Sequence, residues 1–494
     1  MNDRISPSLK AALDVMRRRL RTGVNADMRC RELRVYGRRA ALLYVDGMVS
    51  TDFLQRYVIA PCLATADAPP PGDLTGALMQ TVPVADATAA KTYSDAITRL
   101  AGGVAVLLCD GMDCALCFDV RFFVRRGISP PLTESVVNGP HQGFNESLRD
   151  NMTLMRRILP TEKLVGEMVT VGSLGPTALC VMYLDGAADE GSVARVQERL
   201  RGVNAEHLLS MGALAQLLED QPRALLPQCC LTERPDRAAS FLLEGQVVIL
   251  MDGAPQALAL PVSLAHLFHT PDDTSLRWQY GTFLRLLRLL GALCTLLLPG
   301  LFVAAVTFHP EALPVTLLTA VMESQAAVPL SIPAETLLML LMFNLINEAG
   351  TRVPGVAGNS LGTVSGLILG QAAVEARLIH PLLIIVVAVA SLGSYAVPDY
   401  SLGMALRIGQ LLFVAAGAVF GVYGMVLLLA VTVVRTCALR SLGSPLTAPA
   451  SPLRPHNPDL ILRLPLWRQR LRTWLGNPDE MERVRGPMRR WDKT

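Results

Sequence analysis

Polar side chains interrupt one apolar stretch in the C-terminal half of the chain. This stretch, IPAETLLMLLMFNLINEAGTR, covers residues 332–352. Its candidate functional residues are Glu335, Asn344, Asn347, Glu348 and Arg352. Ionisable groups at membrane depth are costly, so they usually face protein or water and often mark ion paths. The pattern therefore favours either an ion path or a buried hydrogen-bonded network that fixes helix packing.

Helix geometry separates the two carboxylates. Asn344 and Glu348 are four residues apart, so they share one helix face. Glu335 precedes Glu348 by 13 residues, which is about 20 Å along a helix, so both cannot reach the same membrane surface. We predict that the face of Asn344 and Glu348 lines a polar cavity or pore in an oligomer. The packing alternative is favoured more for Glu335 than for Glu348.

The next apolar stretch, about 358–376, carries two further candidates and a row of glycines. Gln371 and Glu375 could line the same path, although Glu375 could also form an interfacial pair with Arg377. The glycines are spaced by four and predict a ridge on which another helix can pack closely: Gly358, Gly362, Gly366 and Gly370. The ridge also explains GNSLG, a match to the G-x-S-x-G hydrolase elbow, so we assign no catalytic residue.

The elements that must hold these residues are membrane helices. Of the 494 residues, 51% are hydrophobic and 18% charged, which is typical of an integral membrane protein. Up to about residue 282, charges alternate with short apolar runs, and long apolar stretches follow. The segments long enough to be considered are 283–308, 332–349, 358–376, 379–398 and 408–434.

Charge sets the expected orientation. The tail 435–494 holds 12 Lys or Arg against 5 Asp or Glu, which places it in the cytoplasm. The N-terminus has no signal peptide, and 309–330 has no Lys or Arg, which suits the outside. Both termini then face the cytoplasm, and the number of crossings is even. Because there are five apolar segments, either one of them does not cross the membrane or one of them contains two crossings. We predict that the segment 332–352 is the one that does not cross and that it is re-entrant or broken. Arg285 and Arg288, at the start of 283–308, are expected to reach the cytosolic surface.

The first half contains a repeat marked by Asp-Gly pairs. Apolar runs end at Asp46, Asp110, Asp185 and Asp252, each followed by Gly, a strong turn signal. The first and third are followed by helix-like sequence, and the second and fourth by another strand-like run. The spacings also agree, at 64 and 67 residues. We therefore predict two related α/β subdomains in a soluble N-terminal half.

The expected domain boundaries follow from these patterns. In chain order they are an N-terminal helical segment 1–24, α/β subdomain 1 at 25–135, a linker helix at 136–159, α/β subdomain 2 at 160–270, a transmembrane domain at 271–434 with four to six membrane segments, and a basic cytoplasmic tail at 435–494. Cys114 and Cys117 form a C-x-x-C without a second ligand pair, so no metal site and no cofactor is expected.

Several stretches together resemble the GerA family of bacterial spore germination proteins. They include TERPDR at 232–237, GQAAVEA at 370–376 and LRSLGSPLTAPASP at 439–452. The family comprises the A subunits of germinant receptors and the paralogous stage V sporulation protein AF. The resemblance extends from about residue 25 to 470. FDVRFFVRRG, 118–127, is similar to the paralog, while the linker fits either branch.

The resemblance implies a multi-pass protein of the spore inner membrane and not an enzyme. It implies a nutrient-responsive or related channel-like complex that triggers ion release, a homo-oligomer in the lipid membrane, and a transporter-like B subunit and a lipoprotein C subunit as partners. Nucleic acid is not an expected partner. The alternative function is a substrate-coupled secondary transporter. The branch, the germinant, the ion and the oligomer number are left open by the sequence.

Overall fold

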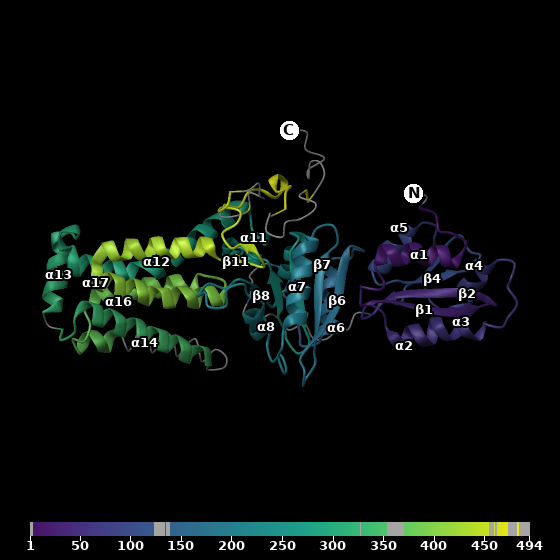
Figure 1. Ribbon diagram of the computed structural model, residues 1–494, viewed down its shortest axis with the longest axis horizontal. Helices are drawn as coiled ribbons and strands as arrows, with labels where there is room; N and C mark the ends of the chain where they lie inside the picture. Colours follow the sequence, from purple (N-terminus) through teal and green to yellow (C-terminus); the bar gives the residue numbers. More distant parts are fainter. Residues whose placement is uncertain are drawn as a thin grey trace.

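The structure is a computed structural model that describes residues 3–122, 134, 139–326, 328–352, 370–453, 459, 462–472 and 482–483. These residues form two α/β units and a bundle of long helices, which follow one another along the longest axis of the molecule (Figure 1). The first unit carries the N-terminus at one end. The second unit lies in the middle and contacts the helices.

The two units contain matching sets of elements. The first unit consists of α1 (Leu9–Leu20), β1 (Met28–Val35), β2 (Arg38–Val45), α2 (Thr51–Phe53), η1 (Leu54–Ile59), α3 (Ala60–Ala64), α4 (Leu74–Thr81), β3 (Ala87–Ala90), α5 (Tyr93–Ala101), β4 (Ala105–Cys109) and β5 (Ala115–Phe118). The second consists of α6 (Leu148–Ile158), β6 (Leu164–Val171), β7 (Thr177–Leu184), α7 (Glu190–Gly202), α8 (Met211–Leu218), β8 (Cys230–Thr232), α9 (Pro235–Leu243), β9 (Val247–Met251), β10 (Ala257–Leu260), α10 (Leu264–Phe268) and α11 (Pro271–Ser275).

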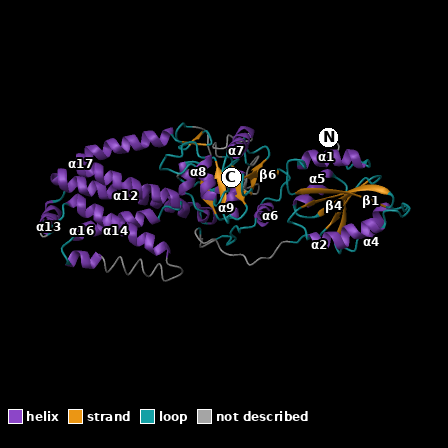
Figure 2. Ribbon diagram, turned by 60° about the horizontal axis from the view of Figure 1, so that its bottom comes forward, coloured by secondary structure: helices purple, strands orange, loops and turns teal. Residues whose placement is uncertain are grey.

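Both sheets have five antiparallel strands in the same order. The orders are β1-β2-β4-β5-β3 and β6-β7-β9-β10-β8, so equivalent strands occupy equivalent places. Helices cover both faces of each sheet (Figure 2), and a separate apolar core fills each face. Every residue of β4 and β9 is buried, as expected for an apolar run enclosed on both faces. The prediction of two related α/β subdomains is confirmed.

The four Asp-Gly pairs follow β2, β4, β7 and β9, and each glycine has a positive φ, between 77° and 88°. In the second and fourth turns, Asp110 and Asp252 accept hydrogen bonds from the N–H groups of Leu9 and Leu148, both at 3.1 Å. These leucines are the first residues of α1 and α6, so the two helices are bound to equivalent turns. The helix that we expected to be a linker therefore packs on the second sheet as α1 packs on the first.

A buried ion pair joins the two units. Arg156 of α6 donates two hydrogen bonds, each of 2.7 Å, to the Asp27 carboxylate of the first unit. The side chain of Arg156 is 1% exposed and that of Asp27 is 5% exposed. Two surface pairs support the same contact, since Arg21 binds Asp185 and Arg149 binds Asp46. These two aspartates belong to equivalent turns, after β7 and β2.

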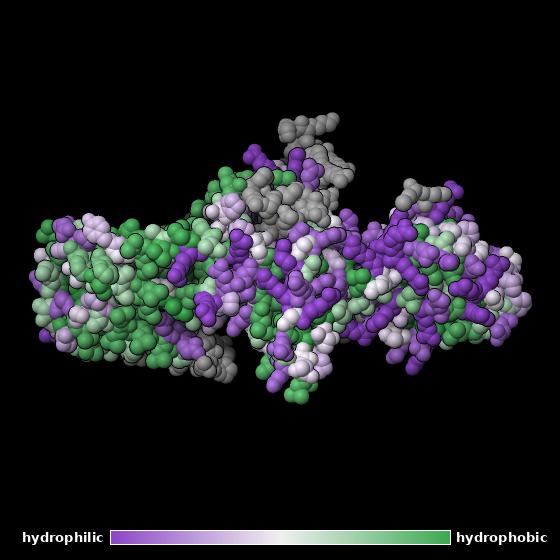
Figure 3. Space-filling view, viewed as in Figure 1, coloured by the Kyte–Doolittle hydropathy of each residue, from purple (hydrophilic) through white to green (hydrophobic). Residues whose placement is uncertain are grey.

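The helical part follows the second unit. Its elements are α12 (Trp278–Phe308), η2 (Pro310–Ala312), α13 (Val315–Gln325), α14 (Ile332–Arg352), α16 (Pro381–Tyr395) and α17 (Tyr400–Ala438), followed by β11 (Arg440–Ser441), β12 (Ser444–Pro445) and η3 (Leu466–Arg468). Within the described part of the chain, three helices are long and apolar enough to cross a membrane: 278–308, 332–350 and 400–438. Hydrophobic residues dominate the surface of this part (Figure 3). These helices confirm the predicted fold class, in which an α-helical multi-pass membrane domain follows the α/β half.

The chain turns back on itself within α17, at Gly421, and does not do so between 332 and 352. Gly421 has φ 59° and ψ −149°, so 400–420 and 422–438 are two arms of a hairpin. Phe413 and Met425 pack in one core between the arms, and Ala405 and Leu439 line one cavity. By contrast, α14 is one continuous helix, so the segment that we expected to be re-entrant or broken is not broken between 332 and 352. That it is re-entrant stays a prediction. The backbone groups of α14 are satisfied by its own helical hydrogen bonds, while only glycine adopts the φ of the turn at 421 without strain.

Close packing between helices also uses glycines that the sequence had not singled out. A Cβ on Gly393 of α16 would lie 2.3 Å from the carbonyl oxygen of Gly291 in α12. A Cβ on Gly417 of α17 would lie 2.6 Å from the carbonyl oxygen of Gly300. The axes of α12, α16 and α17 therefore approach as closely as small residues permit. This core positions the polar side chains described next.

Candidate functional site at the junction of the second unit and the membrane helices

A carboxylate and an imidazole are paired inside the helical part. The Glu335 Oε2 atom of α14 lies 2.8 Å from His380 Nδ1 and accepts a second, 3.3 Å bond from the His380 N–H. Both side chains are almost completely buried, and the ring of Phe302 stacks on the imidazole with centroids 5.4 Å apart. Glu335 Oε1 and His380 Nε2 have no hydrogen-bond partner among the described residues. The pair therefore joins the first turn of α14 to the start of α16 inside the helical part.

A second polar group joins the other ends of the same helices. The Tyr395 hydroxyl of α16 lies 2.6 Å from the side-chain amide of Asn347 in α14. Arg407 of α17 donates from Nε to Ser394 Oγ at 3.1 Å, and its guanidinium stacks over the Tyr395 ring at 5.1 Å. The Asn347 oxygen accepts from Arg407 in the amide orientation that satisfies both of its atoms. Because this group and the buried pair join opposite ends, α14 and α16 run parallel.

A polar cavity of about 370 Å³ separates this second group from the second α/β unit. Its walls include Glu134, Arg237, Tyr395, Asp399 and Arg407. Burial raises the pKa of the Asp399 carboxyl above its ordinary value, although this carboxyl also accepts a hydrogen bond from Leu402 N–H as the cap of α17. The cavity therefore brings carboxyl and guanidinium groups together where the unit meets three membrane helices.

The TERPDR stretch supplies one wall of the cavity. Arg234 is fully buried and binds Asp236 with bonds of 3.0 and 2.7 Å. Arg237 forms an ion pair with Glu134 and donates to the carbonyls of His266 and His269, both at 3.2 Å. These contacts connect α9 to the chain before α6 and to the loop that leads into α12. These contacts give the motif a structural role within the second unit.

The first turns of α12 are held by a buried carboxylate. Asp273 Oδ2 lies 3.0 Å from Arg285 Nε and 3.0 Å from Arg288 Nη1. Arg285 also binds Asp459 of the tail at 2.6 Å. Burial alone would raise the pKa of Asp273, but hydrogen bonds and charges from Arg288 and Arg285 outweigh it and lower the pKa. Arg285 and Arg288 are therefore largely buried in an ion-pair network. Their place at the cytosolic surface of the membrane stays a prediction.

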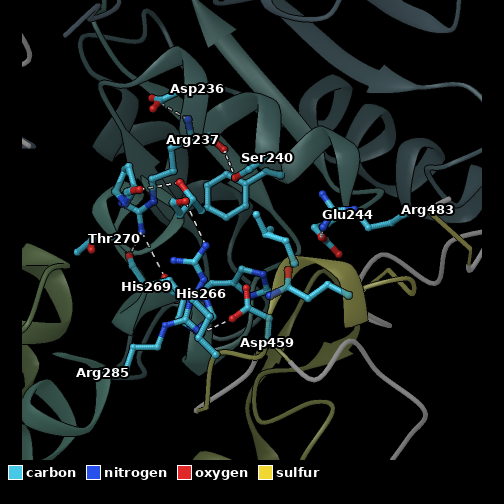
Figure 4. Close-up of a pocket in the computed structure, with 16 residues that line it drawn as sticks. Asp236, Arg237, Ser240, Glu244, His266, His269, Thr270, Arg285, Asp459 and Arg483 are labelled. Atoms are coloured by element: carbon cyan, nitrogen blue, oxygen red, sulfur yellow. Dashed lines mark hydrogen bonds and ion pairs between the residues drawn. The ribbon is translucent and has the colours of Figure 1, made fainter. Parts of the chain in front are cut away.

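Beside this network lies a second cavity, of about 240 Å³, lined by α9, the 266–274 segment, α12 and the tail (Figure 4). His266 points into it. Burial, with the charges of His269 and Arg237, lowers the pKa of His266 to about 3, so the ring is neutral at physiological pH. Its Nδ1 atom lies 2.8 Å from Ser263 Oγ.

Comparison with known proteins identifies the family. The family described as "Bacillus/Clostridium GerA spore germination protein" matches residues 14–474. The chain belongs to the GerA family. Spore germination protein KA of Bacillus subtilis (strain 168) is 32% identical over 94% of this chain and 86% of the relative. Spore germination protein B1 of the same organism is 33% identical over 97% and 100%, respectively.

One solved structure also aligns with the GerA chain. It is the crystal structure of the N-terminal domain of the A subunit of the Bacillus megaterium spore germinant receptor GerK3. The identity is 25%, the TM-score 0.42, and the alignment covers 52% of this chain and 95% of that one.

The structure distributes the candidate residues of this GerA protein over different environments. Glu335 lies in the buried pair and Asn347 in the second polar group. Asn344 is half-buried and Glu348 is exposed on α14, whereas the side chain of Arg352 lies outside the described residues. Gln371 and Glu375 are both exposed.

Of the predicted glycine ridge, Gly358, Gly362 and Gly366 lie outside the described residues. A Cβ on Gly370 would meet no atom of the described residues within 4 Å. Among the described residues, there is no group of three or more His, Cys, Asp or Glu side chains arranged to hold a metal ion.

The sequence analysis did not single out five polar residues of the candidate site: His380, Tyr395, Asp399, Arg407 and Asp273. For two of them the sequence contains a feature that could have drawn attention to them. His380 directly precedes Pro381 at a helix start, and Arg407 is a charge within an apolar helix, both of which are unusual at membrane depth.

Proposed function

We propose that this protein is a membrane subunit of a spore germination complex that relays a nutrient signal from its α/β half to an ion path through the membrane. The observation that carries this proposal is the anchoring of α12 and α17 in the second unit. Asp273 holds Arg285 and Arg288 of α12, while Asp399 caps α17 beside Arg237. A displacement of the second unit would move both helices.

The proposed ion path runs along the exposed face of α14 in an oligomer. Glu348 is exposed on this face and Asn344 is half-buried beside it, one turn away. Glu335 faces the opposite way, into the core with His380, so its role is to hold α14 on α16. A ring of identical subunits would present one Glu348 from each copy, and a ring of carboxylates favours cations. A transporter-like B subunit and a lipoprotein C subunit are the proposed partners, in the spore inner membrane.

The ion path is tested by K⁺ efflux from proteoliposomes that contain the purified oligomer. Glu348→Gln should lower cation selectivity, because it removes the charge and keeps the shape. Glu323→Gln is the matched control, since Glu323 is an exposed carboxylate on α13. Unchanged conductance and selectivity in Glu348→Gln, at equal protein levels, would assign Glu348 to another role.

The relay is tested in spores. Asp273→Asn should keep the protein in the membrane but weaken the nutrient response, because Arg285 and Arg288 would lose their shared carboxylate. Asp272→Asn changes the neighbouring, half-buried carboxylate and should have little effect. Equal nutrient responses in the two variants would argue against coupling through the contact between Asp273 and the first turns of α12.

We also propose that both termini and the α/β units are cytoplasmic. The η2–α13 segment, which lacks Lys and Arg, lies at the end of the bundle away from the units (Figure 1), consistent with an outer location. A cysteine placed at position 480 of a cysteine-depleted variant should resist an impermeant probe in intact cells. Labelling from outside would reverse this orientation.

A further inference from the structure

A large apolar groove lies where the α17 hairpin meets the second unit. Its volume is about 880 Å³, within the range of small-molecule sites. One wall is formed by the two arms of α17, and the other by the loop 221–226 between α8 and β8. The apolar lining residues include Leu225, Leu296, Leu406, Leu412, Phe413, Leu428 and Val431. Leu412 is 56% exposed and Val431 is 44% exposed, so the groove is open to the surroundings of the helices.

Two arginines stand in the lining of this groove, one from each wall. Arg223 belongs to the loop of the second unit, and Arg435 lies in the last turn of α17. Both are exposed, and neither forms an ion pair with another described residue. The lining contains no Asp or Glu among the described residues. The groove is thus lined mainly by apolar side chains and carries two positive charges.

The walls are held together by hydrogen bonds and do not depend on an occupant. The Gln228 side chain closes the loop by accepting from Gln221 N–H at 2.9 Å and donating to the Gln221 carbonyl at 2.7 Å. Ser441, just after α17, donates to the Gln228 carbonyl at 2.5 Å. Gly443 N–H donates to the Asp220 carboxylate at 2.8 Å. The loop and the end of α17 therefore keep a fixed relative position.

We propose that this groove binds an anionic phospholipid. An acyl chain would lie between the arms of α17, and the phosphate would lie between Arg223 and Arg435. Arg435 is three residues from the end of α17, at the level where the helix leaves the apolar zone, which is where a headgroup lies. Basic pockets between membrane helices on the cytoplasmic side recognise anionic headgroups. An apolar helix of a second copy would instead bury both arginines without partners, which is unfavourable.

The bound phosphate would have a structural consequence. It would bridge one charge on the second unit and one on the membrane hairpin, so that the lipid stabilises their contact. The inference is independent of the proposed ion path, because neither Asn344 nor Glu348 lines the groove.

The test measures lipid retained by the purified full chain, by native mass spectrometry and by exchange with phosphatidylglycerol or phosphatidylcholine nanodiscs. Wild type should retain phosphatidylglycerol in preference to phosphatidylcholine. Arg223→Gln and Arg435→Gln should each weaken retention about fivefold, and the double variant about thirtyfold. Arg440→Gln is the control, because Arg440 is exposed nearby and does not line the groove.

A second variant tests the apolar part. Val431→Trp should fill the groove and reduce retention of both lipids while the arginines remain. Equal retention of the two lipids by wild type, or equal losses in the control and double variants, would overturn the proposal. So would displacement by millimolar inorganic phosphate alone, which would indicate a free-anion site. A photoreactive residue at position 431 that crosslinks to a second copy and not to lipid would assign the groove to an oligomer contact.

Discussion

Replacing Arg156 by Met should separate the two α/β units more effectively than any change to their surface contacts. The variant leaves the Asp27 carboxylate buried, with two charged hydrogen bonds lost. It also removes the 2.6 Å bond to the Leu164 carbonyl and the 2.8 Å bond to Asn25 Oδ1. Removing one partner of a buried ion pair costs about 3–5 kcal/mol, and the four bonds lost here support the upper part of that range.

The matched control is Arg149→Gln, on the same helix and across the same contact. Arg149 is 56% exposed and its partner Asp46 is 30% exposed, so the expected loss is about 0–1 kcal/mol. The double variant Asp27→Leu, Arg156→Met should recover much of the stability, because no buried charge remains unpaired.

Thermal unfolding and amide hydrogen exchange of the full chain provide the measurement. The Gly166 amide donates to Asn25 at 2.9 Å, and Ala26 N–H donates to the Gly166 carbonyl, so peptides covering 164–168 report directly on the contact. Arg156→Met should accelerate exchange there and leave β4 unaffected. If Arg156→Met and Arg149→Gln have equal effects, the buried pair does not hold the units together and the reasoning fails.

Two further predictions concern packing and pH. Gly393→Ala should destabilise the helical part by about 1–3 kcal/mol, because its Cβ would clash with the Gly291 carbonyl. The control is Gly370→Ala, where a Cβ meets no described atom within 4 Å, and equal melting temperatures would contradict the packing. For His266, the folded pKa of about 3 lies below the usual value near 6.5, so the unfolded state binds the extra proton first. Its contribution to stability is complete above pH 6.5 and declines toward pH 3, by at most about 1.4 kcal/mol per pH unit. His266→Gln should remove this acid sensitivity, whereas a change at the exposed His207 should not.

The repeat was predictable because its signals are local. Each Asp-Gly pair specifies a turn by its own chemistry, and the matching spacings of 64 and 67 residues identify the four turns as a repeat. The equivalence of α1 and α6 could not be predicted from the sequence. It depends on hydrogen bonds from the first residues of these helices to Asp110 and Asp252, which lie about a hundred residues further along the chain.

The membrane part was predictable in class but less so in detail. Hydropathy marks apolar segments, yet it is almost uniform across Gly421, so the reversal of α17 leaves no hydropathy signal. The pairing of Glu335 with His380 joins residues 45 positions apart and depends on helix packing. A buried carboxylate could be expected to have a partner, but its identity is set by the tertiary arrangement.

The surface pairs between the α/β units bear on how many such units the chain can contain. Asp46 and Asp185 occupy equivalent turns, but their partners are not equivalent, since Arg149 lies at the start of α6 and Arg21 directly follows the end of α1. The two units therefore meet through different surfaces, and such a contact between related bodies does not close on itself. The contact between the units thus sets no upper limit on their number, and in this chain the series ends where the second unit is bound to α12 instead.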